Sequence, residues 1–163
     1  EVKEALRSEK IPFDEKMDVG IMIEVPSAVA IADILAKEVE FFSIGTNDLT
    51  QYTMAADRGN SNVAQLANAL NPAVLRLIQQ TVEAGHDAGI WVGMCGELAG
   101  NAAAAPLLIG LGLDELSMSA PSIPAVKDAI RDVSMAEAQK LAETVLTLDS
   151  AEAVGNHLAN NSA

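Results

Sequence analysis

The sequence predicts an α/β protein with a parallel sheet, and three observations support this prediction. A chain of 163 residues can form one domain with a sizeable core. Half of the residues are hydrophobic but only 3% are aromatic, which is typical of helices packed on a sheet. Short apolar runs alternate with helical patterns, as in parallel βα folds. This pattern leaves two architectures open, a doubly wound sheet or part of a β/α barrel.

Four strands are expected, each a short apolar run that ends at glycine, proline or polar residues. They cover residues 19–25, 41–45, 90–96 and 114–119. Helical patterns cover residues 27–40, 71–89, 98–112, 122–133 and 134–148. The third of these helices is expected to be interrupted near Pro106. No strand is followed by the glycine-rich dinucleotide fingerprint, which argues against a nucleotide-binding doubly wound fold.

Several helices carry recognisable start signals. Asn71 is expected to cap the helix that follows it, and Ser27 and Ser122 are expected to do the same for theirs. Ser134 and Glu137 have the spacing of a capping box.

We expect residues 1–163 to form a single piece of one domain, with a βα core over residues 17–155 and a frayed tail over residues 156–163. The first ten residues are charged and helical in pattern, and the chain begins without an initiator methionine. We therefore interpret the chain as a fragment.

Charge and cysteine content exclude several classes of function. The formal net charge is -13, and no lysine and arginine cluster is present, so nucleic acid is not an expected partner. A single cysteine allows no intramolecular disulfide, which indicates a cytoplasmic protein. No apolar run approaches the roughly 20 residues of a membrane span, so membrane insertion is not expected.

Every predicted strand is followed by polar side chains. Because the carboxyl ends of parallel strands meet at one edge of a sheet, these side chains are expected to gather there. They are Glu24 after the first strand, Asn47 and Asp48 after the second, Cys95 and Glu97 at the third, and Ser117 and Ser119 at the fourth.

Glu24 and Asp48 form the candidate metal site. Two carboxylates on neighbouring strands could hold one magnesium ion between hard oxygen ligands and leave positions for water and substrate. The alternative is structural: Glu24 caps the helix that begins near Ser27, and Asp48 binds the backbone of its own loop.

Cys95, Arg58 and the two histidines also have alternative interpretations. Cys95 lies between glycines and is either a small buried hydrophobe or a proton donor or nucleophile. Arg58 could bind a phosphate or carboxylate as a fork, or pair with Asp57 on the surface. His86 and His157 have no evident partner, and both are predicted to be surface residues.

Three segments, residues 21–28 (IMIEVPSA), 43–60 (SIGTNDLTQYTMAADRGN) and 93–100 (GMCGELAG), lie in this order at the ends of predicted strands. Together with residues 111–123 (LGLDELSMSAPSI), they resemble the C-terminal, phosphoenolpyruvate-binding domain of enzyme I of the bacterial sugar phosphotransferase system. Pyruvate phosphate dikinase and phosphoenolpyruvate synthase share related motifs, but CGELAG and YTMAADRGN are more similar to enzyme I.

The resemblance implies an eight-stranded (β/α) barrel of the TIM type, of which this chain supplies about four βα units, the C-terminal half. It also implies transfer of a phosphoryl group from phosphoenolpyruvate to a protein histidine, which yields pyruvate in the first step of sugar transport. Glu24 and Asp48 match magnesium ligands. Asn47, Asp48 and Arg58 match substrate-binding positions, and Cys95 matches the residue that protonates the enol.

The resemblance further implies a homodimer, and a phosphocarrier protein that binds a separate N-terminal domain containing the phosphorylated histidine. Further substrate-binding arginines come from earlier barrel strands in that family, so we expect this chain alone to be inactive as a phosphotransferase. Two other functions stay open: another pyruvate-enolate enzyme (a dikinase, a phosphoenolpyruvate synthase or a metal-dependent aldolase), or a non-catalytic dimerisation segment.

Overall fold

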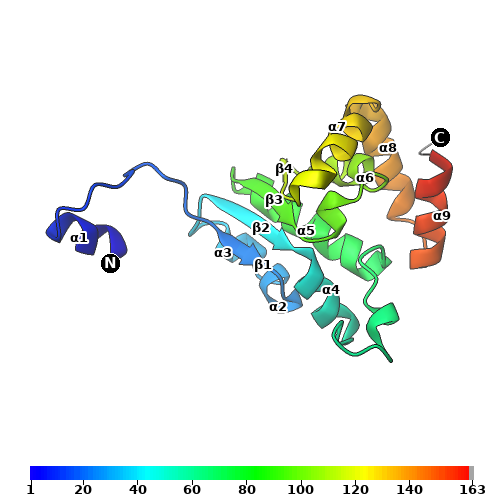
Figure 1. Ribbon diagram of the computed structural model, residues 1–163, viewed down its shortest axis with the longest axis horizontal. Helices are drawn as coiled ribbons and strands as arrows, with labels where there is room; N and C mark the ends of the chain where they lie inside the picture. The colour runs from blue at the N-terminus through cyan, green and yellow to red at the C-terminus, as the bar shows by residue number, and fades with distance from the viewer. Residues whose placement is uncertain (162–163) are drawn as a thin grey trace.

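A parallel sheet lies at the centre of the chain in the computed structural model, which describes residues 1–161 (Figure 1). In this part of the chain the sheet has four strands in the order β1-β2-β3-β4. Their bounds are β1 (Ile21–Ile23), β2 (Phe41–Gly45), β3 (Trp91–Cys95) and β4 (Glu115–Leu116). The parallel α/β prediction is confirmed. The strands follow chain order without the reversal that marks a doubly wound sheet, which is consistent with half of a barrel.

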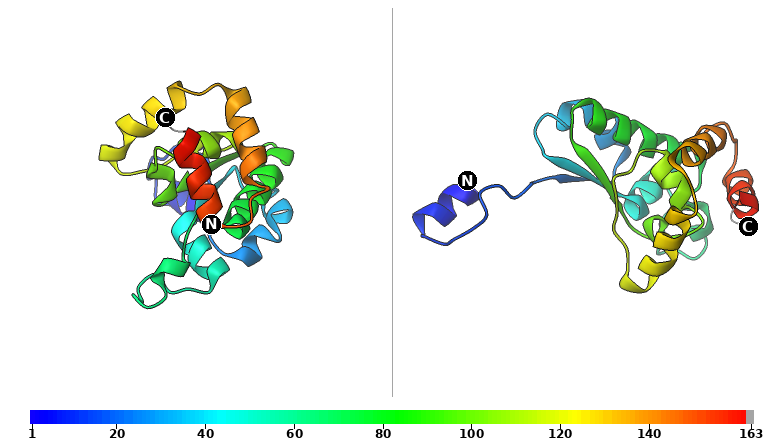
Figure 2. Two further views of the ribbon diagram at one scale, coloured as in Figure 1. Left: turned by 90° about the vertical axis from the view of Figure 1, so that its right-hand side faces the viewer. Right: turned by 90° about the horizontal axis from the view of Figure 1, so that it is seen from above.

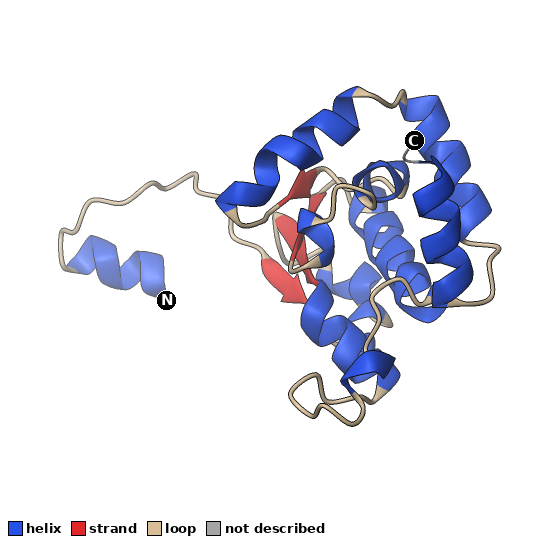
Figure 3. Ribbon diagram, turned by 45° about the vertical axis from the view of Figure 1, so that its right-hand side comes forward, coloured by secondary structure: helices blue, strands red, loops and turns tan. Residues whose placement is uncertain are grey.

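The two faces of the sheet differ. One face packs against helices and carries side chains that are fully buried: Ile23, Phe42, Ile44, Val92 and Met94. Figure 3 shows most of the helical ribbon on one side of the strands. Because side chains alternate along a strand, the intervening residues project to the other side. We call this second side the open face: Met22, Glu24, Phe41, Ser43, Gly45, Trp91, Gly93 and Cys95.

The helices that follow β1 form two groups along the chain. Around β1 and β2 lie α2 (Pro26–Val29), α3 (Ala32–Leu35) and α4 (Thr46–Met54), and the long α5 (Pro72–Asp87) follows after the short 3-10 turn η1 (Ala64–Leu66). The second group follows β3 and β4 along the chain: η2 (Leu98–Gly100), α6 (Ala105–Gly110), η3 (Ala120–Ser122), α7 (Ile123–Arg131), α8 (Met135–Val145) and α9 (Ala151–Asn161). The predicted break near Pro106 is present, because α6 begins at Ala105.

Three local predictions need correction. The single helix expected over residues 27–40 is two short helices, and Val25 rather than Ser27 is the N-cap of α2, with proline in its first turn. Ser122 stands at the N-cap of α7 but makes no capping hydrogen bond through its side chain. The frayed tail is wrong up to Asn161, because α9 is helical there and Leu158 is buried. Residues 162–163 lie outside the described residues.

Two predicted caps are present. Asn71 Oδ1 accepts a hydrogen bond of 2.9 Å from the backbone N–H of Ala73 at the start of α5. Ser134 and Glu137 form the predicted capping box of α8.

The N-terminal helix α1 (Val2–Ser8) stands apart from the rest of the chain, at the end of an extended segment (Figure 2). None of its residues is buried. Arg7 pairs with Glu15 at 2.6 Å and lies over the ring of Phe13. No helix in residues 1–161 has the length and apolar character needed to cross a membrane.

Candidate functional site

Glu24, Gly45 and Cys95 lie level with one another across three neighbouring strands. The register pairs Ile23 with Ile44, and pairs Gly45 with Cys95. Glu24 follows Ile23 directly, so it stands beside Gly45 at the carboxyl edge of the sheet. All three residues belong to the open face, because their preceding neighbours point to the helices. The carboxylate and the thiol therefore project from the same side of the sheet.

Gly45 leaves space between these two side chains. A Cβ atom at this position would lie 2.8 Å from Glu24 Oε2 and 2.8 Å from the terminal methyl of Met22. The Glu24 carboxylate thus extends over the backbone of Gly45, toward the strand that carries Cys95. Any larger residue at this position would occupy the path between the acid and the thiol.

Asn47 and Asp48 are in the first turn of α4, where the sequence pattern had predicted a loop. The helix begins immediately after β2 and carries both side chains to the edge of the sheet. The alternative role of Asp48, a hydrogen bond to its own loop backbone, is not found in the structure of this segment. Asp48 Oδ1 instead lies 3.4 Å from Arg58 Nη2. Both side chains are partly exposed.

Arg58 therefore pairs with Asp48 and not with Asp57. The Asp57 carboxylate accepts a hydrogen bond of 2.7 Å from the backbone N–H of Gly59, which closes the local turn. The surface pairing considered for Arg58 is thus wrong in its partner. The guanidinium stands beside Asp48, the candidate metal ligand.

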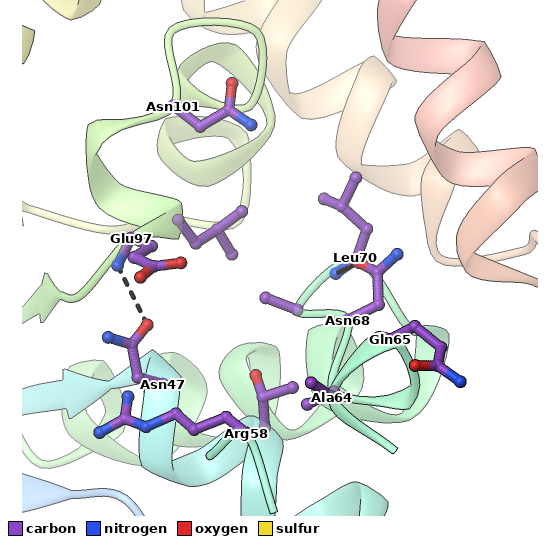
Figure 4. Close-up of a pocket in the computed structure, with 12 residues that line it drawn as sticks. Asn47, Arg58, Ala64, Gln65, Asn68, Leu70, Glu97 and Asn101 are labelled. Atoms are coloured by element: carbon purple, nitrogen blue, oxygen red, sulfur yellow. Dashed lines mark hydrogen bonds between the residues drawn. The ribbon is translucent and has the colours of Figure 1, made fainter. Parts of the chain in front are cut away.

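The side-chain amide of Asn47 has a defined orientation. Its Oδ1 accepts a hydrogen bond of 3.1 Å from the backbone N–H of Glu97 (Figure 4). The NH₂ group of the amide can therefore donate hydrogen bonds to a ligand. An anionic ligand needs such N–H donors. Figure 4 also shows Asn47 and Arg58 next to each other on one wall of a cavity, with Glu97 above them.

Cys95 is half-buried, and its thiol is free. The hydroxyl of Ser43 donates to its Sγ at 3.9 Å, a long and weak contact. The backbone carbonyl of Cys95 is held more firmly, by a hydrogen bond of 2.9 Å from the hydroxyl of Thr46. The sequence pattern does not single out Thr46, Gly45 or Ser43. Gly45 is marked only by its position between a strand and the polar pair Asn47 and Asp48.

Two cavities lie on either side of the contact between Asn47 and Glu97. The larger, of about 580 Å³, is lined mainly by amide and small apolar side chains: Asn47, Thr50, Arg58, Ala64, Gln65, Ala67, Asn68, Ala69, Leu70, Glu97, Leu98 and Asn101. The other, of about 490 Å³, includes the predicted rim residues Ser117 and Ser119. Glu24, Asp48 and Cys95 line neither cavity. Glu24 and Cys95 thus project from the open sheet face, and Asp48 lies at the edge of the sheet in the first turn of α4.

The donor set suits a magnesium ion that shares its ligands with a substrate. Within residues 1–161, no group of three or more histidine, cysteine, aspartate or glutamate side chains is arranged to hold a metal. Glu24 and Asp48 would supply two oxygen ligands, and the other positions would be taken by water and ligand oxygens. Magnesium commonly binds in this way, through one or two carboxylates plus substrate phosphates.

The histidines lie away from this site. His86 is on the surface as predicted but does have a partner, because its Nε2 lies 2.9 Å from Asp114 Oδ2. Asp114 also accepts a hydrogen bond of 2.8 Å from the backbone N–H of Val92. This pair joins the end of α5 to the segment before β4, at the opposite edge of the sheet from Cys95. His157 lies on α9 and is partly exposed.

Comparison with known proteins supports the motif assignment. The model of the phosphoenolpyruvate-binding domain of phosphoenolpyruvate-utilising enzymes matches residues 1–135. A phosphoenolpyruvate-protein phosphotransferase of Buchnera aphidicola (subsp. Acyrthosiphon pisum) is 54% identical over 155 residues, covering 95% of this chain and 27% of that protein. One from Haemophilus influenzae is 55% identical over 145 residues, covering 89% of this chain and 25% of that protein.

A longer relative has a different name. The multiphosphoryl transfer protein 2 of Escherichia coli K12 is 55% identical over 141 residues, covering 86% of this chain and 17% of that protein. The chain thus spans about a quarter, or less, of the length of these relatives.

Proposed function

This chain belongs to the phosphoenolpyruvate-binding domain family of phosphoenolpyruvate-utilising enzymes, and from this premise we propose that it carries one side of a phosphoenolpyruvate site. The proposed reaction is phosphoryl transfer from phosphoenolpyruvate to a protein histidine, with release of pyruvate. The name of its relatives indicates, for them, phosphoryl transfer from phosphoenolpyruvate to a protein. The observation that carries the proposal is the alignment of Glu24 and Cys95 on one face of the sheet, with Gly45 between them.

Each site residue has a role that its chemistry permits. Arg58 and the NH₂ group of Asn47 bind oxygens of the phosphate, where positive charge and N–H donors are needed. Glu24 and Asp48 would hold a magnesium ion. When bound, the ion acts as a Lewis acid toward phosphate and enolate oxygens.

Cys95 completes the reaction as a proton donor. When the bond between phosphorus and the enol oxygen breaks, the phosphoryl group passes to a histidine nitrogen and the electron pair stays on the enol oxygen. The Cys95 thiol then gives its proton to the methylene carbon, which becomes the methyl group of pyruvate. A thiol suits this step because it carries a proton that it can donate to carbon.

We propose that the four strands are half of an eight-stranded barrel. The chain-order arrangement and the one-sided helices support this, since the open face corresponds to a barrel interior. The edges of β1 and β4 would then pair with further strands that supply more arginines. Such residues are needed because a net charge of -13 repels a trianionic substrate. The assembled protein is a cytoplasmic homodimer whose histidine domain passes the phosphoryl group to a phosphocarrier protein.

Calorimetry tests the metal side of this proposal. Magnesium chloride and phosphoenolpyruvate are titrated into the wild-type chain, into Asp48→Asn and into Asp57→Asn. Asp57→Asn is a matched control, because Asp57 is also close in sequence to Arg58 but is engaged by Gly59. We expect binding heat for the wild type and the control, and none for Asp48→Asn. Absence of heat for the wild type would contradict a residual site in this chain.

Proton exchange tests the role of Cys95. In the reverse of the protonation step, the Cys95 thiolate removes a methyl proton of pyruvate. Pyruvate in D₂O with magnesium therefore exchanges its methyl protons if Cys95 and the metal ligands act together. NMR follows the loss of the methyl signal. Cys95→Ala should abolish catalysed exchange, and Asp48→Asn should reduce it. Equal exchange by the wild type and Cys95→Ala would refute the proton-donor role.

A further inference from the structure

Thr46 occupies an unusual position next to the site. The buried polar side chains in residues 1–161 are three threonines, Thr46, Thr50 and Thr81. Thr46 is fully buried at the first position of α4, between Gly45 and the site residues of that helix. Its hydroxyl donates a hydrogen bond of 2.9 Å to the backbone carbonyl of Cys95, on the neighbouring strand.

The turn after β3 lies directly on this hydroxyl. Gly96 has φ +105°, in the region that favours glycine, and a Cβ there would collide with Thr46 Oγ1. One residue further, the backbone N–H of Glu97 donates to Asn47 Oδ1 at 3.1 Å. Two consecutive residues of α4 therefore bind the turn at residues 95–97.

We propose that Thr46 is a positioning residue for the reaction, because it sets the direction of the Cys95 thiol relative to Asp48. This inference rests on the proposed function of Cys95 as a proton donor. The thiol's own contact, to the Ser43 hydroxyl at 3.9 Å, is too long to hold it firmly. Its orientation therefore depends on the backbone of Cys95, and the Thr46 hydroxyl holds that backbone.

The same hydrogen bond links the two halves of the site. Asp48 lies two residues after Thr46 on α4, and Cys95 lies on β3. The side chain of Thr46 binds β3, and Thr46 belongs to the same helix as Asp48. The positions of Asp48, the metal ligand, and Cys95, the proton donor, are therefore fixed relative to each other. Loss of the hydroxyl would separate them without removing either group.

Alkylation of Cys95 gives a direct test, since it is the single cysteine of the chain. We compare the iodoacetamide rate for the wild type, Thr46→Val, Thr46→Ser and Thr81→Val. Thr81 is the matched control, because its buried hydroxyl also donates to a carbonyl, that of Leu77, far from the site. Loss of one buried hydrogen bond predicts a rate about tenfold higher in Thr46→Val. Thr46→Ser and Thr81→Val should stay within about twofold of the wild type.

Two outcomes would overturn the inference. One is an unchanged rate in Thr46→Val, and the other is an equal increase in Thr81→Val, which would indicate general loosening. Thermal unfolding establishes that each variant is folded. If Thr46→Val does not fold, the iodoacetamide rate is measured for Thr46→Ala, and the same two outcomes apply.

Exchange of pyruvate methyl protons separates this inference from the proposed function. Thr46→Val should lower the maximal exchange rate about tenfold and leave the magnesium half-saturation within about twofold. A merely structural role would change both, and Thr46→Ser should restore the rate. If the wild-type chain shows no exchange, the proposed function fails for this chain, whereas the alkylation rates still decide whether Thr46 positions the thiol.

Discussion

Replacement of Gly45 by alanine should weaken magnesium binding without unfolding the protein. The new Cβ would lie 2.8 Å from Glu24 Oε2, while ordinary contacts begin near 3.4 Å. The carboxylate must therefore move by roughly half an ångström, more than the ~0.2 Å tolerance of metal–ligand distances. A disturbed ligand of this kind costs about 10- to 100-fold in metal affinity. The φ angle of Gly45 is −84°, so alanine itself is not strained.

The unfolding free energy should fall by about 1–3 kcal/mol, because the new Cβ would also lie 3.0 Å from Glu24 Cβ, which moves only with its backbone. The smaller unfolded-state entropy of alanine offsets part of this cost. Calorimetric titration with magnesium and denaturant unfolding measure the two quantities separately. Gly93→Ala is a matched control, since its Cβ would lie 2.9 Å from Glu115 Oε2 on the same face. Equal magnesium affinity in the wild type and Gly45→Ala, or an equal loss in Gly93→Ala, would refute the assignment of Glu24.

Three further predictions concern stability. Partial burial raises the pKa of Asp114, but the hydrogen bonds from Val92 N–H and with His86 outweigh it and hold the pKa below its usual value. The contribution of Asp114 to stability is therefore present above its unfolded-state pKa and is lost as the pH falls through its folded-state pKa. Acid unfolding of Asp114→Asn should lack this pH dependence. Ser134→Ala should lower the unfolding free energy by about 1 kcal/mol through loss of the capping box, as measured by urea unfolding. Gly110→Ala should cost about 1–3 kcal/mol, because its Cβ would overlap the backbone of α8, and an unchanged melting temperature would contradict this packing.

The strands could be predicted because their apolar runs are short and well bounded. The segment 41–45 is a strand as expected, and the other three lie inside their predicted ranges. Helix α4 was missed because it is rich in threonine, asparagine and aspartate, which have weak helix propensity. It forms because Leu49 is fully buried and Thr50 nearly so, and such tertiary packing is not visible in local sequence.

The site residues were predictable as a polar rim but their contacts were not. The motif placed Asn47, Asp48 and Arg58 near one another, and the structure adds that Arg58 faces Asp48. The Thr46 hydrogen bond to Cys95 depends on the register between β2 and β3, which no local pattern reveals. The same holds for the pairing of His86 with Asp114, which joins residues 28 positions apart.

The chain-order sheet has a consequence for folding. The segments from β1 to β2 and from β3 to β4 are each compact βαβ units with short separations along the sequence. Pairing of β2 with β3 closes a much longer stretch, since Thr46 and Cys95 are 49 positions apart. Loop-closure entropy makes such contacts slow to form. Thr46 and Asp48 therefore belong to one early unit, and Cys95 belongs to the other. The carboxylates of Glu24 and Asp48 come close to the Cys95 thiol only when these two units dock.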